Sequence, residues 1–202
     1  GLAIGVTAAG DVAKDRIAYR SGAKPNDLIC LSGDLGAAYM GLHLLEREKR
    51  ACGGQPDPKP KFEGHEYILG RQLKPEARTD IIERLAEAGI VPTSMIDITD
   101  GLASETLHLC KSSGCGARIY LDRLPIARQT HDMAEELHAD PVVAALNGGQ
   151  DYELLFTVPL SKQQEIFALG VDVIGHVTAA GTGAMLVTPD GSEIALKAPG
   201  WK

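Results

Sequence analysis

The sequence predicts an α+β protein in which helices cover a mixed β-sheet. Short apolar and β-branched runs occur together with segments of helical apolar spacing, and glycine or proline separates them. The strands and helices do not alternate strictly, which disfavours a doubly wound parallel sheet. A chain of 202 residues, 44% hydrophobic and 23% charged, is also typical of a globular domain with a sizeable core.

Charge, hydropathy and cysteine usage exclude several classes of protein. The net charge is −7, no basic run is present, and aromatic residues make up only 4% of the chain, which disfavours nucleic acid as a partner. No apolar run approaches the roughly 18 residues that a membrane-spanning helix needs. The four cysteines form no CxxC pair, which indicates reduced thiols: Cys30, Cys52, Cys110 and Cys115. We therefore expect a cytoplasmic protein that binds neither nucleic acid nor membranes.

The first quarter of the chain predicts two strands and a helix. Alternating small and β-branched residues indicate a strand over residues 2–12, and the apolar run 28–32 indicates a buried strand. The segment 33–36, which contains two glycines, then leads into a helix that we expect to end near residue 50. One stripe of this helix is apolar: Leu35, Ala38, Leu42 and Leu45.

Proline and glycine delimit the next helix. Residues 51–64 are the most loop-like segment of the chain. Pro75 fits the first turn of a helix that continues to Ala88, and Gly89 fits its end. The apolar positions of this helix predict the face that packs on the core: Ile81, Ile82, Leu85 and Ala88.

The central stretch, 95–102, begins as a short alternating strand and passes through a glycine into a helix. Residues two apart in a strand share a face, so Asp97 and Thr99 point the same way. Ile96 and Ile98 then point into the core. A carboxylate inside an apolar strand costs several kcal/mol unless it is paired or coordinated, which favours a role for Asp97.

Asp97 and Asp100 bring two carboxylates to the start of a helix. Asp100 directly precedes Gly101, where its side chain can cap the helix N-terminus, and an Asp at such a position is most often only a cap. Two carboxylates, the Thr99 hydroxyl and free backbone N–H groups also suit Mg²⁺ held together with a nucleotide phosphate. The residues alone leave both interpretations open.

The second half of the chain predicts further short helices and strands. The break at residues 147–151 precedes the strongest of these strands, and Ser161 is expected to cap the helix that ends at Leu169. We expect strands over 116–121, 152–158, 171–177, 184–188 and 193–196, and short helices over 132–137 and 141–146.

Four motifs occur in an order that resembles the thiamine-monophosphate kinase family, within the superfamily of aminoimidazole ribonucleotide synthetase and selenophosphate synthetase. They are Arg20-Ser21-Gly22-Ala23-Lys24-Pro25, Asp97-Ile98-Thr99-Asp100-Gly101-Leu102, Gly148-Gly149-Gln150-Asp151-Tyr152-Glu153-Leu154-Leu155-Phe156 and Gly200-Trp201. Any one of them is only suggestive, whereas the ordered set is specific. The resemblance covers nearly the whole chain but only the C-terminal part of the family's enzyme.

This resemblance implies a magnesium-dependent kinase of thiamine diphosphate biosynthesis. ATP is the co-substrate, and its γ-phosphoryl group is transferred in line to thiamine monophosphate, giving thiamine diphosphate and ADP. The matching positions imply catalytic Mg²⁺ ligands at Asp97 and Asp100, ATP contacts at Arg20 and Thr99, and substrate contacts at Gln150 and Trp201.

The resemblance also implies a domain division. Residues 1–16 are expected to be the last strand and link of a missing N-terminal domain that binds ATP and metal, and residues 17–202 the C-terminal domain. The enzyme is expected to be a homodimer through the missing domain, and this chain alone is expected to be inactive. Position 150 departs from the family, because Gln150 replaces the usual Glu.

Two other functions remain open. One is a different ATP-dependent synthetase of the same superfamily, acting on a purine intermediate or on selenide. The other is a non-catalytic binding domain of the same fold, although the presence of both Asp97 and Asp100 disfavours it. Arg20 could also be an ordinary surface arginine in a turn, and Trp201 a packing residue.

Overall fold

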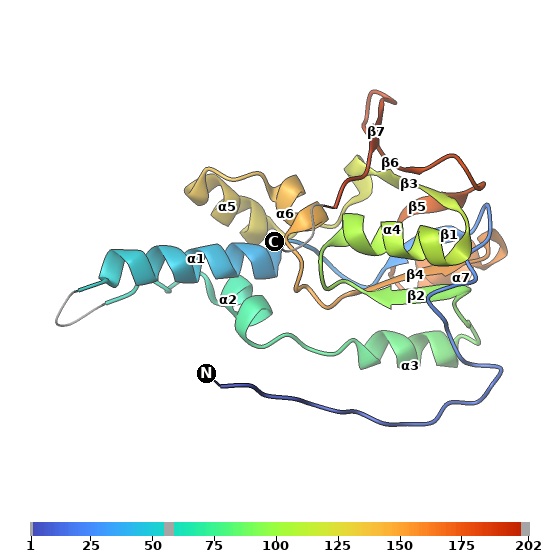
Figure 1. Ribbon diagram of the computed structural model, residues 1–202, viewed down its shortest axis with the longest axis horizontal. Helices are drawn as coiled ribbons and strands as arrows, with labels where there is room; N and C mark the ends of the chain where they lie inside the picture. Colours follow the sequence, from blue (N-terminus) through green and yellow to red (C-terminus); the bar gives the residue numbers. More distant parts are fainter. Residues whose placement is uncertain (1, 55–58, 199–202) are drawn as a thin grey trace.

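The computed structural model describes residues 2–54 and 59–198. Its centre is a seven-stranded sheet with the order β2-β4-β1-β5-β3-β6-β7 (Figure 1). Neighbouring strands are antiparallel except β3 and β6, which are parallel, so the predicted mixed sheet is confirmed. The strands are β1 (Leu28–Leu31), β2 (Ser94–Asp97), β3 (Gly116–Tyr120), β4 (Leu154–Val158), β5 (Asp172–Thr178), β6 (Ala184–Val187) and β7 (Glu193–Ala195).

The described part of the chain also contains seven α-helices. In Figure 1, α4 lies across the sheet, whereas α1, α2 and α5 form a group beside it. None of the helices that the structure describes has the length and apolar character needed to cross a bilayer. The helices are α1 (Ala37–Cys52), α2 (Glu66–Leu73), α3 (Thr79–Glu87), α4 (Leu102–Ser113), α5 (Arg128–Leu137), α6 (Pro141–Asn147) and α7 (Gln163–Ala168).

Strand β1 is buried on both faces of the sheet. Ile29 and Leu31 point into one hydrophobic cluster, which α4 and α6 cover. Leu28 and Cys30 point into a second cluster, which side chains of α3 and α7 complete. Because successive side chains of a strand point to opposite faces, a continuous apolar run is what a strand between two helical layers requires.

The helices beside the sheet have a hydrophobic cluster of their own. Met40 of α1, Ile68 of α2 and Met133 of α5 are each 1% exposed or less and belong to this third cluster. Helix α2 was not predicted from the sequence, because its eight residues include Gly70 and only a short apolar pattern. Its packing against α1 and α5 therefore stabilises it more than its own sequence does.

The predicted apolar stripe of α1 is only partly correct. Leu35 and Ala38 are fully buried, as expected. Leu42 and Leu45 are only half-buried, whereas Leu44 is fully buried. The reason is that α2 and α5 pack against the face that carries Leu44, and this face is rotated from the predicted stripe.

The helix predicted over residues 75–88 is shorter than expected, since α3 begins at Thr79. Ile81 and Leu85, which are one turn apart, are each 2% exposed, but Ile82 is 46% exposed. A helix that lies on a sheet buries one narrow stripe, and a neighbouring position is rotated by about 100° from it. The inward position predicted for Ile82 is therefore wrong.

Two predicted helix caps are also not formed. Helix α7 begins at Gln163 after a 3-10 turn that contains Ser161, and no side chain caps it. Helix α4 has Gly101 at its N-cap and likewise receives no hydrogen bond from a capping side chain, so Asp100 is not a cap. Gly101 has a φ of 107°, which turns the chain before the Asp100 carboxylate can reach the helix N–H groups.

The strand expected over residues 2–12 is absent from the structure. Leu2, Ile4 and Val6 are 89%, 80% and 89% exposed. A strand needs a neighbour for its backbone hydrogen bonds, and no strand of the described chain pairs with this segment, which runs past α3 (Figure 1). The assignment of residues 1–16 to an N-terminal domain remains a prediction.

Candidate functional site

The end of β2 and the loop before β4 are joined by backbone hydrogen bonds. The N–H of Ile98 donates to the carbonyl of Glu153 at 2.8 Å, and Tyr152 N–H donates back to Ile98 at 2.9 Å. The N–H of Gln150 donates to the carbonyl of Thr99 at 2.7 Å. Two motifs about fifty residues apart in the sequence are thus fixed side by side at the N-terminus of α4.

Two glycines permit this close approach. Gly149 has a φ of 71°, and a Cβ there would lie 2.3 Å from the Thr99 carbonyl oxygen. Gly101 has a φ of 107°, and a Cβ there would lie 2.6 Å from the Leu146 carbonyl oxygen. Any larger residue at either position would both strain the backbone and separate the loops.

Asp97 and Thr99 share a face, as the sequence predicts. The Thr99 hydroxyl donates to Oδ2 of Asp97 at 2.8 Å, while Ile96 and Ile98 are buried on the other side. Asp97 is the last residue of β2, and both it and Asp100 are exposed. Because Asp97 is exposed, it does not bear the cost of burying a carboxylate in an apolar strand. The burial argument for a metal role of Asp97 therefore fails. What remains is a pair of solvent-facing carboxylates next to a helix N-terminus.

A third carboxylate, Glu105, lies beneath this pair and was not singled out from the sequence. It is in the first turn of α4 and only 3% exposed. Its Oε1 accepts from the N–H of Asp100 at 3.3 Å, and its Oε2 is buried without a partner. Burial is the main cause that raises the pKa of Glu105 to about 7; backbone N–H groups oppose this change, and the nearby carboxylates of Asp100 and Asp97 favour it to a smaller extent. An acid in the first turn after the aspartate motif is the only signal that the sequence offers.

The donor chemistry suits a cation that a phosphate helps to hold. No three His, Cys, Asp or Glu side chains of the described residues lie close enough to hold a metal by themselves. Mg²⁺ is commonly bound through one or two carboxylates together with substrate phosphates, rather than in a cage of protein ligands. Asp97 and Asp100 meet that description.

Gln150 lies beside this carboxylate pair. It is half-buried, and its Oε1 accepts from Nε2 of Gln72 on α2 at 3.2 Å. Gln150 and Tyr152 have φ values of 60° and 53°, a conformation that costs a residue other than glycine about 1 kcal/mol. The backbone bonds to the aspartate motif hold the loop in this shape, which fixes the direction of the Gln150 side chain.

Asp151 caps a helix from far away in the sequence. It is 2% exposed, and its Oδ2 accepts from Gly36 N–H at 2.9 Å and its Oδ1 from Ala38 N–H at 3.4 Å. Burial raises the pKa of Asp151 to about 6, although these two N–H groups oppose the change. The site loop is thereby attached to the N-terminus of α1.

Glu153 anchors the other side of the loop. Only 1% exposed, it pairs with Arg71 of α2 at 2.9 Å and is in close contact with Arg78 and Ser32. Arg71 also donates to the carbonyl of Asp151 at 3.2 Å. One buried carboxylate thus ties α2 and the start of α3 to the sheet.

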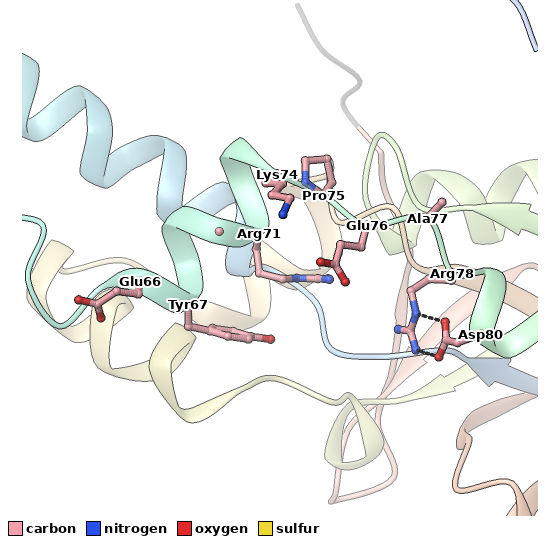
Figure 2. Close-up of a pocket in the computed structure, with 10 residues that line it drawn as sticks. Glu66, Tyr67, Arg71, Lys74, Pro75, Glu76, Ala77, Arg78 and Asp80 are labelled. Atoms are coloured by element: carbon pink, nitrogen blue, oxygen red, sulfur yellow. Dashed lines mark hydrogen bonds and ion pairs between the residues drawn. The ribbon is translucent and has the colours of Figure 1, made fainter.

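An open cavity of about 500 Å³, lined in part by Arg71 and Arg78, lies between the end of α2 and the start of α3 (Figure 2). Arg78 forms two 3.0 Å bonds to Asp80 on its wall. The charged side chains of the wall are of both signs and equal in number, so the cavity as a whole is electrically balanced. Its lining is Glu66, Tyr67, Gly70, Arg71, Lys74, Pro75, Glu76, Ala77, Arg78 and Asp80.

The structure does not bring Arg20, one of the predicted site residues, to this place. Arg20 is exposed, and Gly22, two residues later, donates its N–H to Ser113 Oγ at 3.2 Å. Ser113 is the last residue of α4, whose 12 residues span about 18 Å, whereas Asp100 precedes the first. Trp201 lies outside the described residues.

Comparison with known proteins identifies relatives over most of the chain. Residues 24–188 match the family model described as AIR synthase related protein, C-terminal domain. A thiamine-monophosphate kinase of Aquifex aeolicus is 32% identical over 93% of this chain and 55% of its own length. One of Escherichia coli is 36% identical over 96% of this chain and 56% of its own length. The chain therefore spans about half the length of these relatives.

Solved structures agree with the fold. A structure of AaThiL complexed with AMPPCP and TMP has a TM-score of 0.73 and 32% identity, covering 93% of this chain and 54% of that one. The thiamine-monophosphate kinase of Stenotrophomonas maltophilia has a TM-score of 0.73 and 26% identity, covering 91% and 56%. The hydrogenase maturation protein HypE in complex with ATP has a TM-score of 0.67 at 15% identity, over 95% and 56%, which bears on the fold alone.

Proposed function

Because the chain belongs to the family of AIR synthase related proteins, whose C-terminal domain it matches, we propose that it is the C-terminal half of a kinase that transfers the ATP γ-phosphoryl group to thiamine monophosphate. The observation that carries this proposal is its likeness, at 32% identity, to AaThiL complexed with AMPPCP and TMP. AMPPCP is an ATP analogue, so that complex has the ligand pair which the proposed reaction requires.

Asp97 and Asp100 are proposed to hold Mg²⁺ on the phosphates. Both carboxylates are exposed, and the Thr99 hydroxyl donates to Asp97, which orients that carboxylate. Thr99 is proposed to contact ATP beside them. When bound, Mg²⁺ supplies positive charge that neutralises the phosphates between which the group moves. The two aspartates then act by position and charge, since in-line phosphoryl transfer asks little covalent chemistry of a protein.

Gln150 is proposed to bind thiamine monophosphate beside these aspartates. Its support is the 2.7 Å bond from its N–H to Thr99, which places the loop next to the proposed phosphate site. In the reaction a phosphate oxygen of thiamine monophosphate forms a bond to the γ-phosphorus, and the bond to ADP breaks. Trp201 remains a proposed substrate contact on the resemblance alone.

Arg20 is proposed to contact ATP at a distance from the transferred group. Its segment is bound to the C-terminal end of α4, about 18 Å along the helix from Asp100. A contact there suits a part of the nucleotide other than the γ-phosphate. A guanidinium can form two parallel hydrogen bonds with a phosphate, which makes arginine the fitting residue type.

The full-length protein is proposed to combine this chain with an N-terminal domain like that of its longer relatives. Residues 1–16 would be the last strand and link of that domain, and residues 17–202 the C-terminal domain. The exposed Leu2, Ile4 and Val6 support this, because they are apolar side chains without a partner in the described chain. We further propose a homodimer through the N-terminal domain, and a cytoplasmic location. The alternative synthetase functions have weaker support, since the curated relatives reported above are thiamine-monophosphate kinases, and the HypE structures, at less than 25% identity, concern only the fold.

The test is product formation by the full-length protein with ATP, Mg²⁺ and thiamine monophosphate. We expect ADP and thiamine diphosphate in equal amounts, and neither when Mg²⁺ is omitted. This chain alone is expected to form no ADP that depends on thiamine monophosphate. ATP hydrolysis at a rate independent of thiamine monophosphate would contradict the proposed substrate. Turnover by the isolated chain would contradict the proposal that the N-terminal domain is needed for activity.

A further inference from the structure

Glu105 differs from the other buried glutamates of the described chain. Glu48 is 6% exposed and accepts from Arg47 Nε at 3.0 Å and from Lys61 N–H at 2.8 Å. Glu153 pairs with two arginines. Glu105 has neither a basic partner nor a contact to its Oε2, within the part of the chain that the structure describes.

An unpartnered buried carboxylate oxygen is costly, so a reason for retaining it is expected. A buried polar group that loses its hydrogen bonds to water and gains none in the protein destabilises the fold, and a charged group does so more strongly. A leucine buried in this position would not carry that cost. The cost therefore indicates that Glu105 serves the site above it.

We propose that Glu105 is a positioning residue for the cation and phosphate site formed by Asp97 and Asp100, an inference that rests on the proposed function. Its Oε1 holds the Asp100 N–H, which fixes the backbone from which the Asp100 carboxylate extends. Its Oε2 stays buried beneath the pair without a partner, so Glu105 presents no atom to a bound ligand. Groups that orient metal ligands from behind commonly change metal affinity by 10- to 100-fold when they are replaced.

The geometry favours positioning over direct ligation. Glu105, Asp97 and Asp100 do not form a cluster able to hold a metal together, as no such group of three occurs among the described residues. Glu105 is also 3% exposed, while the two aspartates face solvent. It consequently acts on the cation through Asp100 and not by binding it.

The experiment measures Mg²⁺-dependent binding of a non-hydrolysable ATP analogue to the full-length protein, together with thermal unfolding. Glu105→Gln keeps the size and one acceptor for the Asp100 N–H but loses the charge. Glu105→Asp keeps the charge but withdraws the carboxylate by one methylene. We expect Glu105→Asp, which moves the acceptor away from the Asp100 N–H, to raise the Mg²⁺ concentration for half-maximal binding about tenfold or more. Glu105→Gln, which keeps a weaker neutral acceptor, should raise that concentration by less, and both variants should show little change in Tm.

Two further variants complete the design. Glu48→Gln is the matched control, since Glu48 is likewise a buried helical glutamate that accepts a backbone N–H, and it should leave Mg²⁺ dependence unchanged. The variant Asp100→Asn, made alone and together with Glu105→Gln, tests whether Glu105 acts on the cation through Asp100. If Glu105 acts through Asp100, the double variant loses less than the sum of the two single effects.

Three outcomes would overturn the inference. One is an unchanged Mg²⁺ dependence in both Glu105 variants, another is fully additive loss in the double variant, and the third is wild-type binding of the analogue that ignores Mg²⁺. Failure to phosphorylate thiamine monophosphate, with Mg²⁺-dependent nucleotide binding intact, would instead refute the proposed substrate and leave this inference standing. Should Glu105→Gln fail to fold, Glu105→Asp carries the test.

Discussion

Arg71 of α2 and Glu153, which precedes β4, form an ion pair in which Nη2 and Oε1 lie 2.9 Å apart. The Glu153 side chain is 2% exposed and that of Arg71 17%, so water screens the pair poorly. A carboxylate that deep is tolerated only because several donors surround it. The pair connects the helical group beside the sheet to the strand that leads out of the site loop.

The first prediction is that Glu153→Gln lowers the free energy of unfolding by about 3 kcal/mol, because removing one partner of a buried pair leaves uncompensated charge on the other. Arg71 and Arg78 would both lose their buried carboxylate, although Arg78 would keep its bonds to Asp80. Urea unfolding of the two proteins measures the difference.

The control for this first prediction is Glu165→Gln. Glu165 pairs with Lys162 at 3.0 Å, but the two side chains are 41% and 39% exposed. Because water screens surface pairs, they contribute little to stability, so this variant should be nearly neutral. Equal destabilisation by the two variants would show that the depth of Glu153 has no energetic consequence.

The second prediction concerns pH and Asp151. Burial raises the pKa of Asp151 from 3.8 to about 6. The folded protein therefore holds this proton more tightly than the unfolded chain, so the associated stability is fully present below pH 3.8 and is lost as pH rises through about 6. We expect the unfolding free energy of wild type minus that of Asp151→Asn to fall as pH rises from 4 to 7.

Urea titrations of both proteins at half-unit pH steps test this second prediction. Asp190→Asn is a suitable comparison, because hydrogen bonds from Thr188 and Ser192 lower the pKa of Asp190 and its contribution has the opposite sign. If the unfolding free energy of wild type minus that of Asp151→Asn instead rises with pH, the N–H groups of Gly36 and Ala38 lower the pKa of Asp151 more than burial raises it.

The third prediction is that Asp97→Asn in the full-length protein reduces kcat/KM at least tenfold, which is about 1.4 kcal/mol of transition-state stabilisation. The amide keeps the size of the side chain but cannot serve as an anionic ligand for Mg²⁺. Because Asp97 is exposed, Tm should stay within a degree or two. Asp132→Asn, which changes a 63% exposed acid on α5, is the control and should leave the rate unchanged. Equal turnover of Asp97→Asn and wild type at saturating Mg²⁺ would remove Asp97 from the proposed metal site.

The elements buried on both sides were the most predictable part of the fold. Strand β1 is a continuous apolar run between two clusters, and its position follows from the sequence alone. Helix α2 could not be predicted, because packing against α1 stabilises it. The expected strand over residues 2–12 is missing for the converse reason: strand propensity without a neighbour gives no hydrogen bonds.

The site was predictable where neighbours in sequence are neighbours in space. The shared face of Asp97 and Thr99 follows from strand periodicity. The contact between Thr99 and Gln150 does not, since it depends on glycines that let two distant loops touch. The capping of α1 by Asp151 joins groups 115 residues apart, which no local pattern reveals.

The last prediction concerns Gln150, where the resemblance leads us to expect Glu. Thiamine monophosphate carries a cationic thiazolium ring, which a carboxylate complements and an amide does not. Charge-assisted hydrogen bonds contribute about 1.5–3 kcal/mol against about 1 kcal/mol for neutral ones. The change Gln150→Glu should therefore tighten binding of thiamine monophosphate about fivefold in the full-length protein, with ATP binding unchanged.

The Gln150→Glu substitution can preserve the hydrogen bond that the Gln150 side chain makes. Gln150 accepts through its Oε1 from Gln72 Nε2 at 3.2 Å, and a glutamate can accept the same bond, so the side chain can keep its direction. Calorimetric titration with thiamine monophosphate measures the dissociation constants of wild type and variant. Gln163→Glu adds the same charge at an exposed position on α7, and it should change the dissociation constant of neither thiamine monophosphate nor ATP. If Gln150→Glu leaves the dissociation constant unaltered, Gln150 does not contact the substrate, and the loop's proposed role would rest on its backbone bond to Thr99 alone.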